Sequence, residues 1–353
     1  MTLPASSELA VASRHDAEGR HNDAIDALAR GTQAGDLACM RELGKRLLAG
    51  DRAPSLGAEG ARFLMDAANQ GDAEAAARAS ALAALGLHRS QNWQEALLWL
   101  VAAAQRGWQL ARDQLTALAA EDAYRKNVAA PGAAIGDWRQ LAASLDLRIW
   151  GAAPAARVLS ADPKVYVFEG FITAPVCEWI VGRARGRLAR AQVYDAASGK
   201  DVVSATRTNS VANLNLASVE LLDLLVQSRM SVASGLPMQN MEAPAVLHYA
   251  PGELNGDHFD FVDPQTPDYA QEIARNGQRV ATFLVYLNDD YDGGATTFPR
   301  LGFEHKARRG EALLFVNALP DMQPDLRMLH AGQPPTRGEK WIVSQFIRSR
   351  ATR

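Results

Sequence analysis

A glycine recurs every 36 residues in the N-terminal third of the chain. The three glycines are Gly35, Gly71 and Gly107, with spacings of 71 − 35 = 36 and 107 − 71 = 36. After each glycine, the same offsets carry small or apolar residues four positions apart, which places them on one helix face. These sets are Cys39, Ala75 and Ala111; Leu43, Ala79 and Leu115; and Leu47, Ala83 and Ala119. The pattern predicts a domain of stacked helical hairpins over residues 1–120.

The repeat resembles the Sel-like branch of the tetratricopeptide family. The stretch "MDAANQGDAEAA" at residues 65–76 matches that signature best, and the third repeat departs from it because Trp108 replaces the aspartate. The resemblance implies a short solenoid. Two functions fit such a domain: a protein-binding or dimerising surface, or a helical appendage that covers the other domain. In the first case, this surface would recruit a peptide or protein substrate.

Residues 121–160 lack the repeat and are predicted to form a linker. Prolines and glycines lie on both sides of a short helix predicted around residues 138–147; they are Pro131, Gly132, Gly136, Gly151 and Pro154. Trp138 and Trp150 lie in this region. Large aromatic residues in a linker usually pack against a neighbour, so we expect a docked junction.

Residues 161–353 favour strands. The stretches "KVYVFEGF", "PAVLHYA", "RVATFLVYLN", "EALLFVN" and "KWIVSQFI" are rich in β-branched and aromatic residues. Two helices are predicted among them, one at residues 173–188 with Thr173 as N-cap and Pro175 in its first turn, the other at residues 216–230. The chain is therefore predicted to be α+β: helical hairpin repeats followed by a double-stranded β-helix, or jelly-roll, with supporting helices.

Charge and cysteine content narrow the class of protein. A formal net charge of −3 argues against a dedicated nucleic-acid or anionic-membrane protein, since these carry a basic excess. The two cysteines, Cys39 and Cys177, fall in different predicted domains and imply no disulfide framework. Because no apolar stretch is long enough to cross a bilayer, we expect a cytoplasmic protein without a membrane partner.

The stretch "NGDHFDFVD" at residues 255–263 contains a candidate two-point metal chelate. On a strand, His258 and Asp260 point to one face while Phe259 points to the other. Alone, the motif is more typical of a surface strand with alternating polarity.

Downstream residues strengthen the metal interpretation. His330 would add a second imidazole, and two histidines with one carboxylate are typical of non-haem Fe(II) oxygenases. Such an ion can bind a 2-oxo acid, whose far carboxylate would need a buried cation and hydrogen-bond donors. Lys340 is the candidate cation, with Arg337 as its rival, and Tyr249 and Thr282 are candidate hydroxyl donors.

Other polar residues are weaker candidates. His248 should face away from its neighbour Tyr249, and His305 lies in a stretch with the composition of a solvated turn. Asp257 should point away from Asp260 and is a candidate for an indirect or substrate contact. Arg207 and Arg279 could bind a substrate carboxylate or form structural ion pairs.

Six ordered blocks over residues 164–348 resemble the Fe(II)/2-oxoglutarate dioxygenases of the prolyl 4-hydroxylase kind. The blocks are "LHYAPGE", "HFD", "GQRVATFLVYLNDDYDGGATTFP", "RRGEALLFVN", "LHAGQPP" and "GEKWIVSQFIR". The resemblance implies that His258, Asp260 and His330 are the iron ligands and catalytic centre, and that Lys340, Tyr249 and Thr282 bind 2-oxoglutarate. It also implies Fe(II), 2-oxoglutarate and O2 as cofactor and cosubstrates, with ascorbate as an accessory reductant.

The implied reaction is hydroxylation of an unactivated C–H bond, most readily of a prolyl residue in a peptide or protein, with release of succinate and CO2. Two departures bear on this. Ala295 replaces a glutamate common in the family, and residues 261–278, with Pro264 and Pro267, favour an ordered cap over a mobile flap.

Two other functions stay open at this point. One is the same chemistry on a free amino acid or small metabolite; nucleic-acid dealkylation is weaker because those enzymes usually anchor the oxo acid with arginine. The other is a catalytically degenerate jelly-roll scaffold that carries a protein-binding repeat domain. The oligomeric state is also left open.

Overall fold

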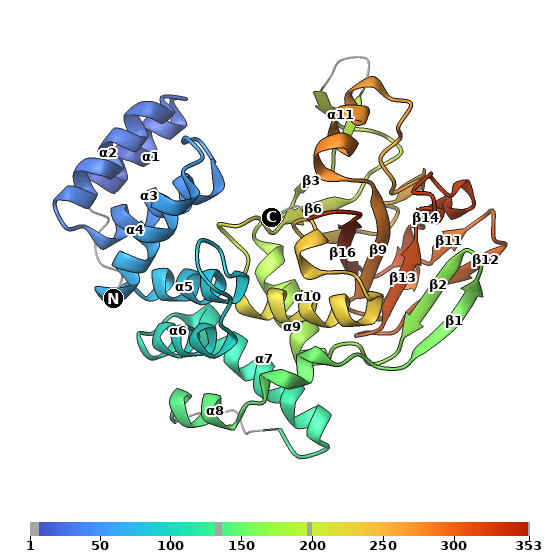
Figure 1. Cartoon of the computed structure of the whole chain (residues 1–353), viewed down its shortest axis with the longest axis horizontal. Helices are drawn as coiled ribbons and strands as arrows, with labels where there is room; N and C mark the ends of the chain where they lie inside the picture. The colour runs from blue at the N-terminus through green and yellow to red at the C-terminus, as the bar shows by residue number, and fades with distance from the viewer. Residues whose placement is uncertain (1–6, 131–135, 196–199, 352–353) are drawn as a thin grey trace. The chain divides into compact units, whose positions relative to one another are not determined.

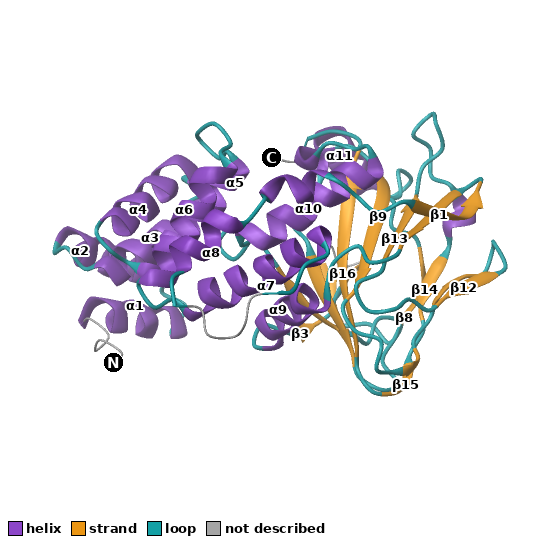
Figure 2. Ribbon diagram, turned by 90° about the horizontal axis from the view of Figure 1, so that it is seen from below, coloured by secondary structure: helices purple, strands orange, loops and turns teal. Residues whose placement is uncertain are grey.

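The computed structural model describes residues 7–130, 136–195 and 200–351, which form two compact units (Figures 1 and 2). The helical unit contains residues 1–147 and a second segment, residues 215–225. The second unit contains residues 148–214 and 226–353, and we call it the catalytic unit because the sequence analysis expects the catalytic residues there. The predicted divisions at residues 120 and 160 stay a prediction; the structure groups residues 121–147 with the repeats. Pro131 and Gly132 of the predicted linker lie outside the described residues.

Three helical hairpins follow a first helix, α1 (Ser7–Ala17), as the 36-residue period predicted. They are α2 (His21–Gln33) with α3 (Leu37–Ala49), α4 (Gly57–Asn69) with α5 (Ala73–Leu85), and α6 (Trp93–Gln105) with α7 (Gln109–Lys126). Gly35, Gly71 and Gly107 lie in the turns with φ of 82°, 106° and 93°, a region that L side chains rarely adopt. The repeat prediction is confirmed.

Capping explains where the second helices of the first two hairpins begin. The carboxylates of Asp36 and Asp72 accept hydrogen bonds from backbone N–H groups in the first turns of α3 and α5. Trp108 occupies this position in the third hairpin and provides no such bond.

The predicted linker contains one short helix, α8 (Trp138–Ser144), whose N-terminus is capped by Asp137. It contacts α6 and α7. In the catalytic unit, Trp150 is buried, and the Arg229 guanidinium lies 4.1 Å from its ring centroid. Each part of the linker therefore packs within its own unit, and the docked junction stays a prediction.

The catalytic unit is built on two facing sheets. Within the described residues, the larger sheet has eight strands, in spatial order β1 (Ala156–Ala161), β2 (Lys164–Phe168), β13 (Ala312–Val316), β9 (Arg279–Tyr286), β16 (Lys340–Arg348), β7 (Ala245–Tyr249), β6 (Ser210–Asn213) and β3 (Ala189–Arg190). The smaller has β12 (Phe303–His305), β11 (Thr296–Phe298), β14 (His330–Gly332) and β8 (Asn255–His258). Two short antiparallel pairs are β4 (Val193–Asp195) with β5 (Lys200–Val202), and β10 (Asp292–Gly293) with β15 (Pro335–Arg337).

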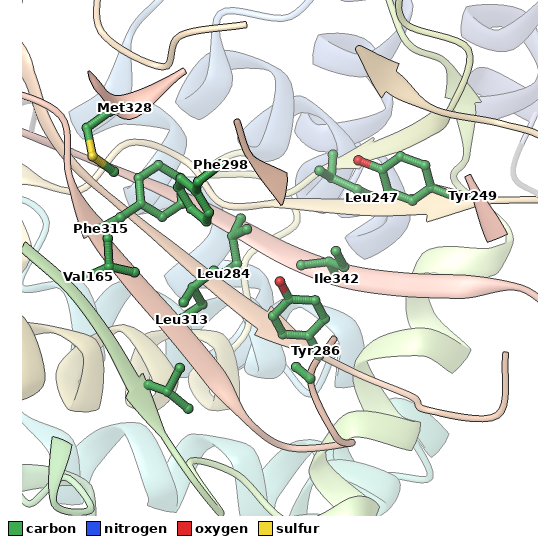
Figure 3. Close-up of a cluster of buried hydrophobic side chains, with 12 residues drawn as sticks. Val165, Leu247, Tyr249, Leu284, Tyr286, Phe298, Leu313, Phe315, Met328 and Ile342 are labelled. Carbon is green, nitrogen blue, oxygen red and sulfur yellow. The ribbon is translucent and has the colours of Figure 1, made fainter. Parts of the chain in front are cut away.

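The core of this unit lies between the sheets (Figure 3). Antiparallel pairing places Leu313 opposite Leu284, and Ile342 opposite both Tyr286 and Leu247, so one face of the larger sheet is apolar. Phe298 of the smaller sheet packs into the same cluster. The predicted α+β class, with helical repeats followed by a jelly-roll, is confirmed.

Helices cover the opposite face of the larger sheet. Helix α9 (Ala174–Arg185) begins after Thr173 with a proline in its first turn, as predicted. Helix α10 (Leu221–Ser234) reaches β16 through a 2.6 Å hydrogen bond from the side chain of Gln227 to that of Gln345. A third helix, α11 (Pro267–Asn276), lies in the predicted cap segment. None of the helices in the described parts of the chain is long and apolar enough to cross a membrane.

Helix α10 begins at Leu221, five residues later than predicted. Asn215 holds the preceding segment in a turn, because its backbone oxygen accepts hydrogen bonds from the N–H groups of Ser218 and Val219. The Asp223 carboxylate then accepts a 2.9 Å bond from the N–H of Glu220, as in a capping box. A backbone turn and one side-chain bond thus replace the first predicted helical turn.

Candidate metal centre

Three predicted ligands converge where the smaller sheet ends. His258 of β8 lies directly opposite His330 of β14, and Asp260 follows two residues after β8 ends. The Asp260 oxygens lie 3.3 Å from the Nε2 atoms of His258 and His330. One potential ligand atom from each residue lies within 4.8 Å of the others, which is a spacing that a single metal ion can bridge.

Backbone carbonyls orient both imidazoles. Nδ1 of His258 lies 2.7 Å from the Gly256 oxygen, and Nδ1 of His330 lies 3.0 Å from the Met328 oxygen. Because a carbonyl oxygen only accepts, Nδ1 carries the hydrogen in each ring. Each Nε2 then carries the lone pair that a metal ion can accept, and that of His258 lies 3.1 Å from the Asn255 amide nitrogen. Two such nitrogens and one carboxylate form a donor set that fits Fe(II).

Asp260 is held by a chain of hydrogen bonds from the larger sheet. The Thr282 hydroxyl donates to Oδ2 of Asp260 at 2.7 Å, and the Asn317 amide donates to the Thr282 oxygen at 2.8 Å. Burial by itself would raise the pKa of Asp260, but His330 and His258 hold it well below its ordinary value. The residue therefore stays an anion, as a metal ligand must.

The sequence analysis assigned Thr282 to 2-oxoglutarate, whereas its hydroxyl bonds to Asp260 in the structure. Neither Asn317 nor this bond was anticipated. The hydrogen bond between Thr282 and Asp260 depends on the path of the chain after β8 ends. The spacing of residues in the sequence does not specify that path.

Lys340 is a buried cation without a partner. Its side chain is fully buried, its amine has no hydrogen-bond partner among the residues that the structure describes, and burial lowers its pKa to about 7. The Lys340 amine lies 5.1 Å from the centroid of the Tyr249 ring and 5.9 Å from that of Tyr286. An unpaired buried amine is costly unless an anion binds it, so this position fits a carboxylate ligand.

Strand register places the Lys340 amine and the Thr282 hydroxyl, which bonds to the metal-ligand carboxylate, on one face of the larger sheet. Lys340 pairs with Tyr249, and Ile342, on the same face as Lys340, pairs with Tyr286. Tyr286 and Thr282 are four residues apart on β9, so both side chains point to that face. The sequence analysis missed Tyr286, although its period-two spacing from Thr282 was a usable signal.

Tyr286 also brings Thr296 to the site. The Tyr286 and Thr296 hydroxyl oxygens lie 2.7 Å apart, and both residues are buried. Burial raises the pKa of Tyr249 and of Tyr286 above the ordinary value. For Tyr249, the Arg207 guanidinium offsets only part of this rise. Both phenols therefore keep their protons and can donate hydrogen bonds to an anion.

The weaker candidates separate in the structure. Arg337 is exposed and pairs with Asp292, so it does not compete with Lys340 for a buried anion. The His305 ring bonds to Glu311 at 2.6 Å, and the ring of His248 packs on Trp341. Asp257, expected to point away from Asp260, is exposed.

The two candidate arginines also differ. Arg279 donates two hydrogen bonds to Glu242 and lies over the Phe346 ring, which is a structural arrangement. Arg207 makes one long bond, 3.4 Å, to the Gln192 carbonyl, and its buried Nε has no partner. Arg207 therefore remains the candidate for substrate contact.

The predicted cap segment contains α11. The Arg348 side chain bonds to Glu272 of this helix and donates to the Gly277 carbonyl at 2.7 Å. A cavity lies beside the segment, and the residues that line it include Phe259, Phe261, Tyr269, Arg279 and Leu326. Ala295 stands where the family commonly has a glutamate. Its backbone oxygen accepts a 2.8 Å hydrogen bond from the backbone N–H of Gln333.

Comparisons with known proteins agree with this architecture. The model of the 2OG-Fe(II) oxygenase superfamily matches residues 244–348. Prolyl 4-hydroxylase 1 of Arabidopsis thaliana is 34% identical over 222 residues, which cover 58% of this chain and 75% of that protein. Probable prolyl 4-hydroxylase 7 of the same plant is 31% identical over 207 residues, covering 54% of this chain and 64% of the relative. The chain thus spans about two thirds of that relative's length.

Solved structures were matched in each half of the chain. The viral collagen prolyl hydroxylase of Paramecium Bursaria Chlorella virus-1 has 24% identity and a TM-score of 0.41, covering 53% of this chain and 96% of that one. A Sel1 repeat protein from Oxalobacter formigenes has 19% identity and a TM-score of 0.30, covering 41% of this chain and 60% of that one. Given the sequence identity to the plant enzymes, the chain belongs to the prolyl 4-hydroxylase family of Fe(II)- and 2-oxoglutarate-dependent dioxygenases.

Proposed function

We propose that this protein hydroxylates prolyl residues of a peptide or protein, using Fe(II), 2-oxoglutarate and O2. The observation that carries the proposal is the buried, unpartnered amine of Lys340 on the sheet face that also holds Asp260 through Thr282. A degenerate scaffold would have no reason to keep a desolvated cation beside an intact set of metal ligands.

The metal would be held by Nε2 of His258, Nε2 of His330 and a carboxylate oxygen of Asp260. The bonds from their Nδ1 atoms to backbone carbonyls fix the two rings before any metal arrives. The Thr282 hydroxyl fixes Asp260 in the same way. Three protein ligands leave the remaining positions of an octahedral ion for 2-oxoglutarate and O2.

The far carboxylate of 2-oxoglutarate would bind Lys340. The amine supplies charge, and the rings of Tyr249 and Tyr286 lie near it. The hydroxyls of these two residues and of Thr296, which bonds to Tyr286, would be the donors, in place of the Thr282 hydroxyl expected from the sequence. When bound, iron and 2-oxoglutarate supply the oxidation: O2 gives one oxygen atom to the C–H bond and one to succinate, with loss of CO2. The protein orients the ligands and excludes water from this buried face.

Two features support a polypeptide substrate. The plant relatives are named prolyl 4-hydroxylases, and the chain is similar to them along the jelly-roll. Arg207 has unused donors close to Tyr249, which suit a backbone carbonyl of a bound peptide. The Arg207→Ala variant should raise KM for a peptide while it leaves the affinity for 2-oxoglutarate unchanged.

The assignment can be tested by product analysis. Purified protein with Fe(II), 2-oxoglutarate, ascorbate and a proline-rich peptide should form succinate and add one oxygen atom to the peptide. His258→Ala should abolish both products, whereas His21→Ala, a change of a half-exposed histidine in the helical unit, should leave them intact. Equal turnover in wild type and His258→Ala would refute the assignment.

The same assay separates the other functions. Turnover of free proline but not of peptides would assign the chemistry to a small metabolite. If the wild type binds no more Fe(II) than Asp260→Ala does, the jelly-roll is a scaffold and not an enzyme. Omitting ascorbate should shorten the period of turnover without changing the product.

A further inference from the structure

The helical unit binds a segment of the chain that lies far away in sequence. Residues 215–225, between β6 and the body of α10, belong to the compact helical unit rather than to the catalytic unit. We propose that equivalent faces of the repeats form a peptide-binding site and that this segment is its occupant.

The contacts to the segment come from one repeat position. Arg78 of α5 and Gln114 of α7 are 114 − 78 = 36 residues apart, so they occupy the same position of consecutive hairpins. Arg78 is 5% exposed, Gln114 is fully buried, and Glu220, which both contact, is 1% exposed. Repeat proteins bind extended ligands in this manner, with equivalent side chains of successive repeats lining one face.

Arg78 recognises both the backbone and a side chain of the segment. Its Nη1 donates to the carbonyl oxygens of Ala217 at 3.2 Å and Val219 at 2.9 Å, and its Nη2 pairs with the Glu220 carboxylate. A guanidinium has enough donors in a fixed plane to satisfy all three acceptors together. The required ligand is therefore a peptide with two carbonyls that are two residues apart and a carboxylate on the next residue.

Gln114 completes the recognition from the next repeat. Its amide donates to the second oxygen of Glu220 at 3.3 Å and accepts a 2.8 Å bond from the N–H of Leu222. Both Glu220 oxygens thus have partners in the helical unit. The equivalent position in the first hairpin, Glu42, instead pairs with Lys45 and Arg46 of its own helix, so it is not used for the segment.

Leu216 anchors the segment by apolar packing. It is partly buried against a cluster formed by Leu48 of α3, Ala61 and Leu64 of α4, and Leu82 of α5. An apolar anchor followed four residues later by a buried carboxylate gives a specific pattern, leucine at position 216 and glutamate at position 220. This face of the repeats therefore holds a peptide of the chain itself, and recruitment of a substrate by the same face would require that peptide to leave.

Hydrogen exchange of the full-length protein tests the occupancy. Removing one partner of a buried ion pair leaves the other charge unpaired, so Arg78→Ala should speed amide exchange in residues 215–225 by at least about tenfold. The conservative Glu220→Gln variant should show a smaller increase. Arg62→Ala, which removes an exposed ion pair on α4, should show none. Unchanged exchange in Arg78→Ala would overturn the proposal.

Binding of a separate peptide tests the site itself. A labelled peptide of residues 214–225 should bind saturably to full-length Glu220→Lys protein, whose own segment no longer fits. It should bind at least about tenfold more weakly to wild type, where the site is filled, and to the Arg78→Ala, Glu220→Lys double variant. Equal binding to the three proteins would overturn the proposal. If Glu220→Lys does not fold, Glu220→Gln takes its place, with the same ranking expected. Neither experiment depends on hydroxylase activity, so its outcome is separate from that of the proposed function.

Discussion

At the scale of single residues, Lys340 is the side chain whose chemistry the fold changes most. Burial lowers its pKa to about 7, from an ordinary value of 10.5, because no anion in the surrounding structure compensates the lost hydration. Between these two pH values the unfolded chain binds a proton that the folded chain does not. The free energy of unfolding should therefore rise with pH through this window and fall as the pH drops to 7.

The Lys340→Met variant isolates this effect. In metal-free protein, the stability gain of the wild type between pH 7 and pH 10.5 should exceed that of the variant by about 3 to 5 kcal/mol. The measurement is urea unfolding at a series of pH values. Lys164→Met, a change of an exposed lysine on β2, serves as the control and should follow the wild type. Parallel curves for wild type and Lys340→Met would show that the amine is not desolvated.

Thr282 should act through Asp260. Thr282→Val keeps the shape of the side chain but removes the hydroxyl that donates to Oδ2 of Asp260. Loss of a partner that orients a metal ligand typically lowers metal affinity about 10- to 100-fold. Competitive titration with Mn(II) measures the affinity, and Thr282→Ser should restore it. If Thr282→Val instead weakens only 2-oxoglutarate binding, the role expected from the sequence is the correct one.

The sequence made some of these residues predictable and hid others. The positions of His258, Asp260, His330 and Lys340 could be proposed because metal and anion sites require those residue types. The partner of Thr282 could not, since it depends on the path of the chain after β8. Tyr286 was accessible through strand periodicity, but nothing in the sequence paired it with Thr296.

At the scale of secondary-structure elements, local signals governed how well the boundaries could be predicted. The hairpins were predictable because a turn glycine with positive φ recurs at a fixed period. The start of α10 was not predictable from the sequence. It is delayed by hydrogen bonds to Asn215 and Asp223, and these residue types would also be compatible with a helix that begins earlier.

Close packing between α3 and α4 depends on Gly60. A Cβ atom at this position would lie 2.4 Å from the backbone nitrogen of Leu48 and 2.7 Å from the oxygen of Gly44, so the helices would have to separate. Overpacking of this kind typically costs about 1 to 3 kcal/mol, which exceeds the gain in helix propensity. Gly60→Ala should therefore lower the free energy of unfolding of the helical unit.

Gly182 of α9 is the matched control for this prediction. It also lies inside a helix, but a Cβ atom there would meet nothing within 4 Å. Gly182→Ala should therefore stabilise the protein by about 0.5 to 1 kcal/mol. Urea unfolding followed by circular dichroism would measure both variants; a stabilising Gly60→Ala would contradict the close approach of α3 and α4.

At the scale of the whole molecule, the chain order and the compact units do not coincide. The sequence suggested a helical half followed by a catalytic half, yet residues 215–225 of the second half belong to the helical unit. The 36-residue relation between Arg78 and Gln114 was visible in the repeat. Their common partner, Glu220, was not, because a contact across more than a hundred residues leaves no periodic trace.

This discontinuity predicts that ligands of the metal centre will protect the repeats. Residues 215–225 continue in sequence into the catalytic unit at both ends. Their contacts with Arg78 and Gln114 should therefore break when either unit unfolds. Mn(II) with 2-oxoglutarate at 100 times its Kd should stabilise the folded protein by about 2.7 kcal/mol. Hydrogen exchange should therefore slow in α5 and α7 as well as in β8 and β14.

Two variants separate coupling from direct binding. In Arg78→Ala, the ligands should still slow exchange in β8 and β14 but no longer in α5 and α7, because the repeats have lost their hold on the segment. In His258→Ala, both effects should disappear, since the metal is no longer bound. If wild-type α5 and α7 exchange at the same rate with and without ligands, the two units unfold independently, and residues 215–225 detach from the repeats without cost to the catalytic unit.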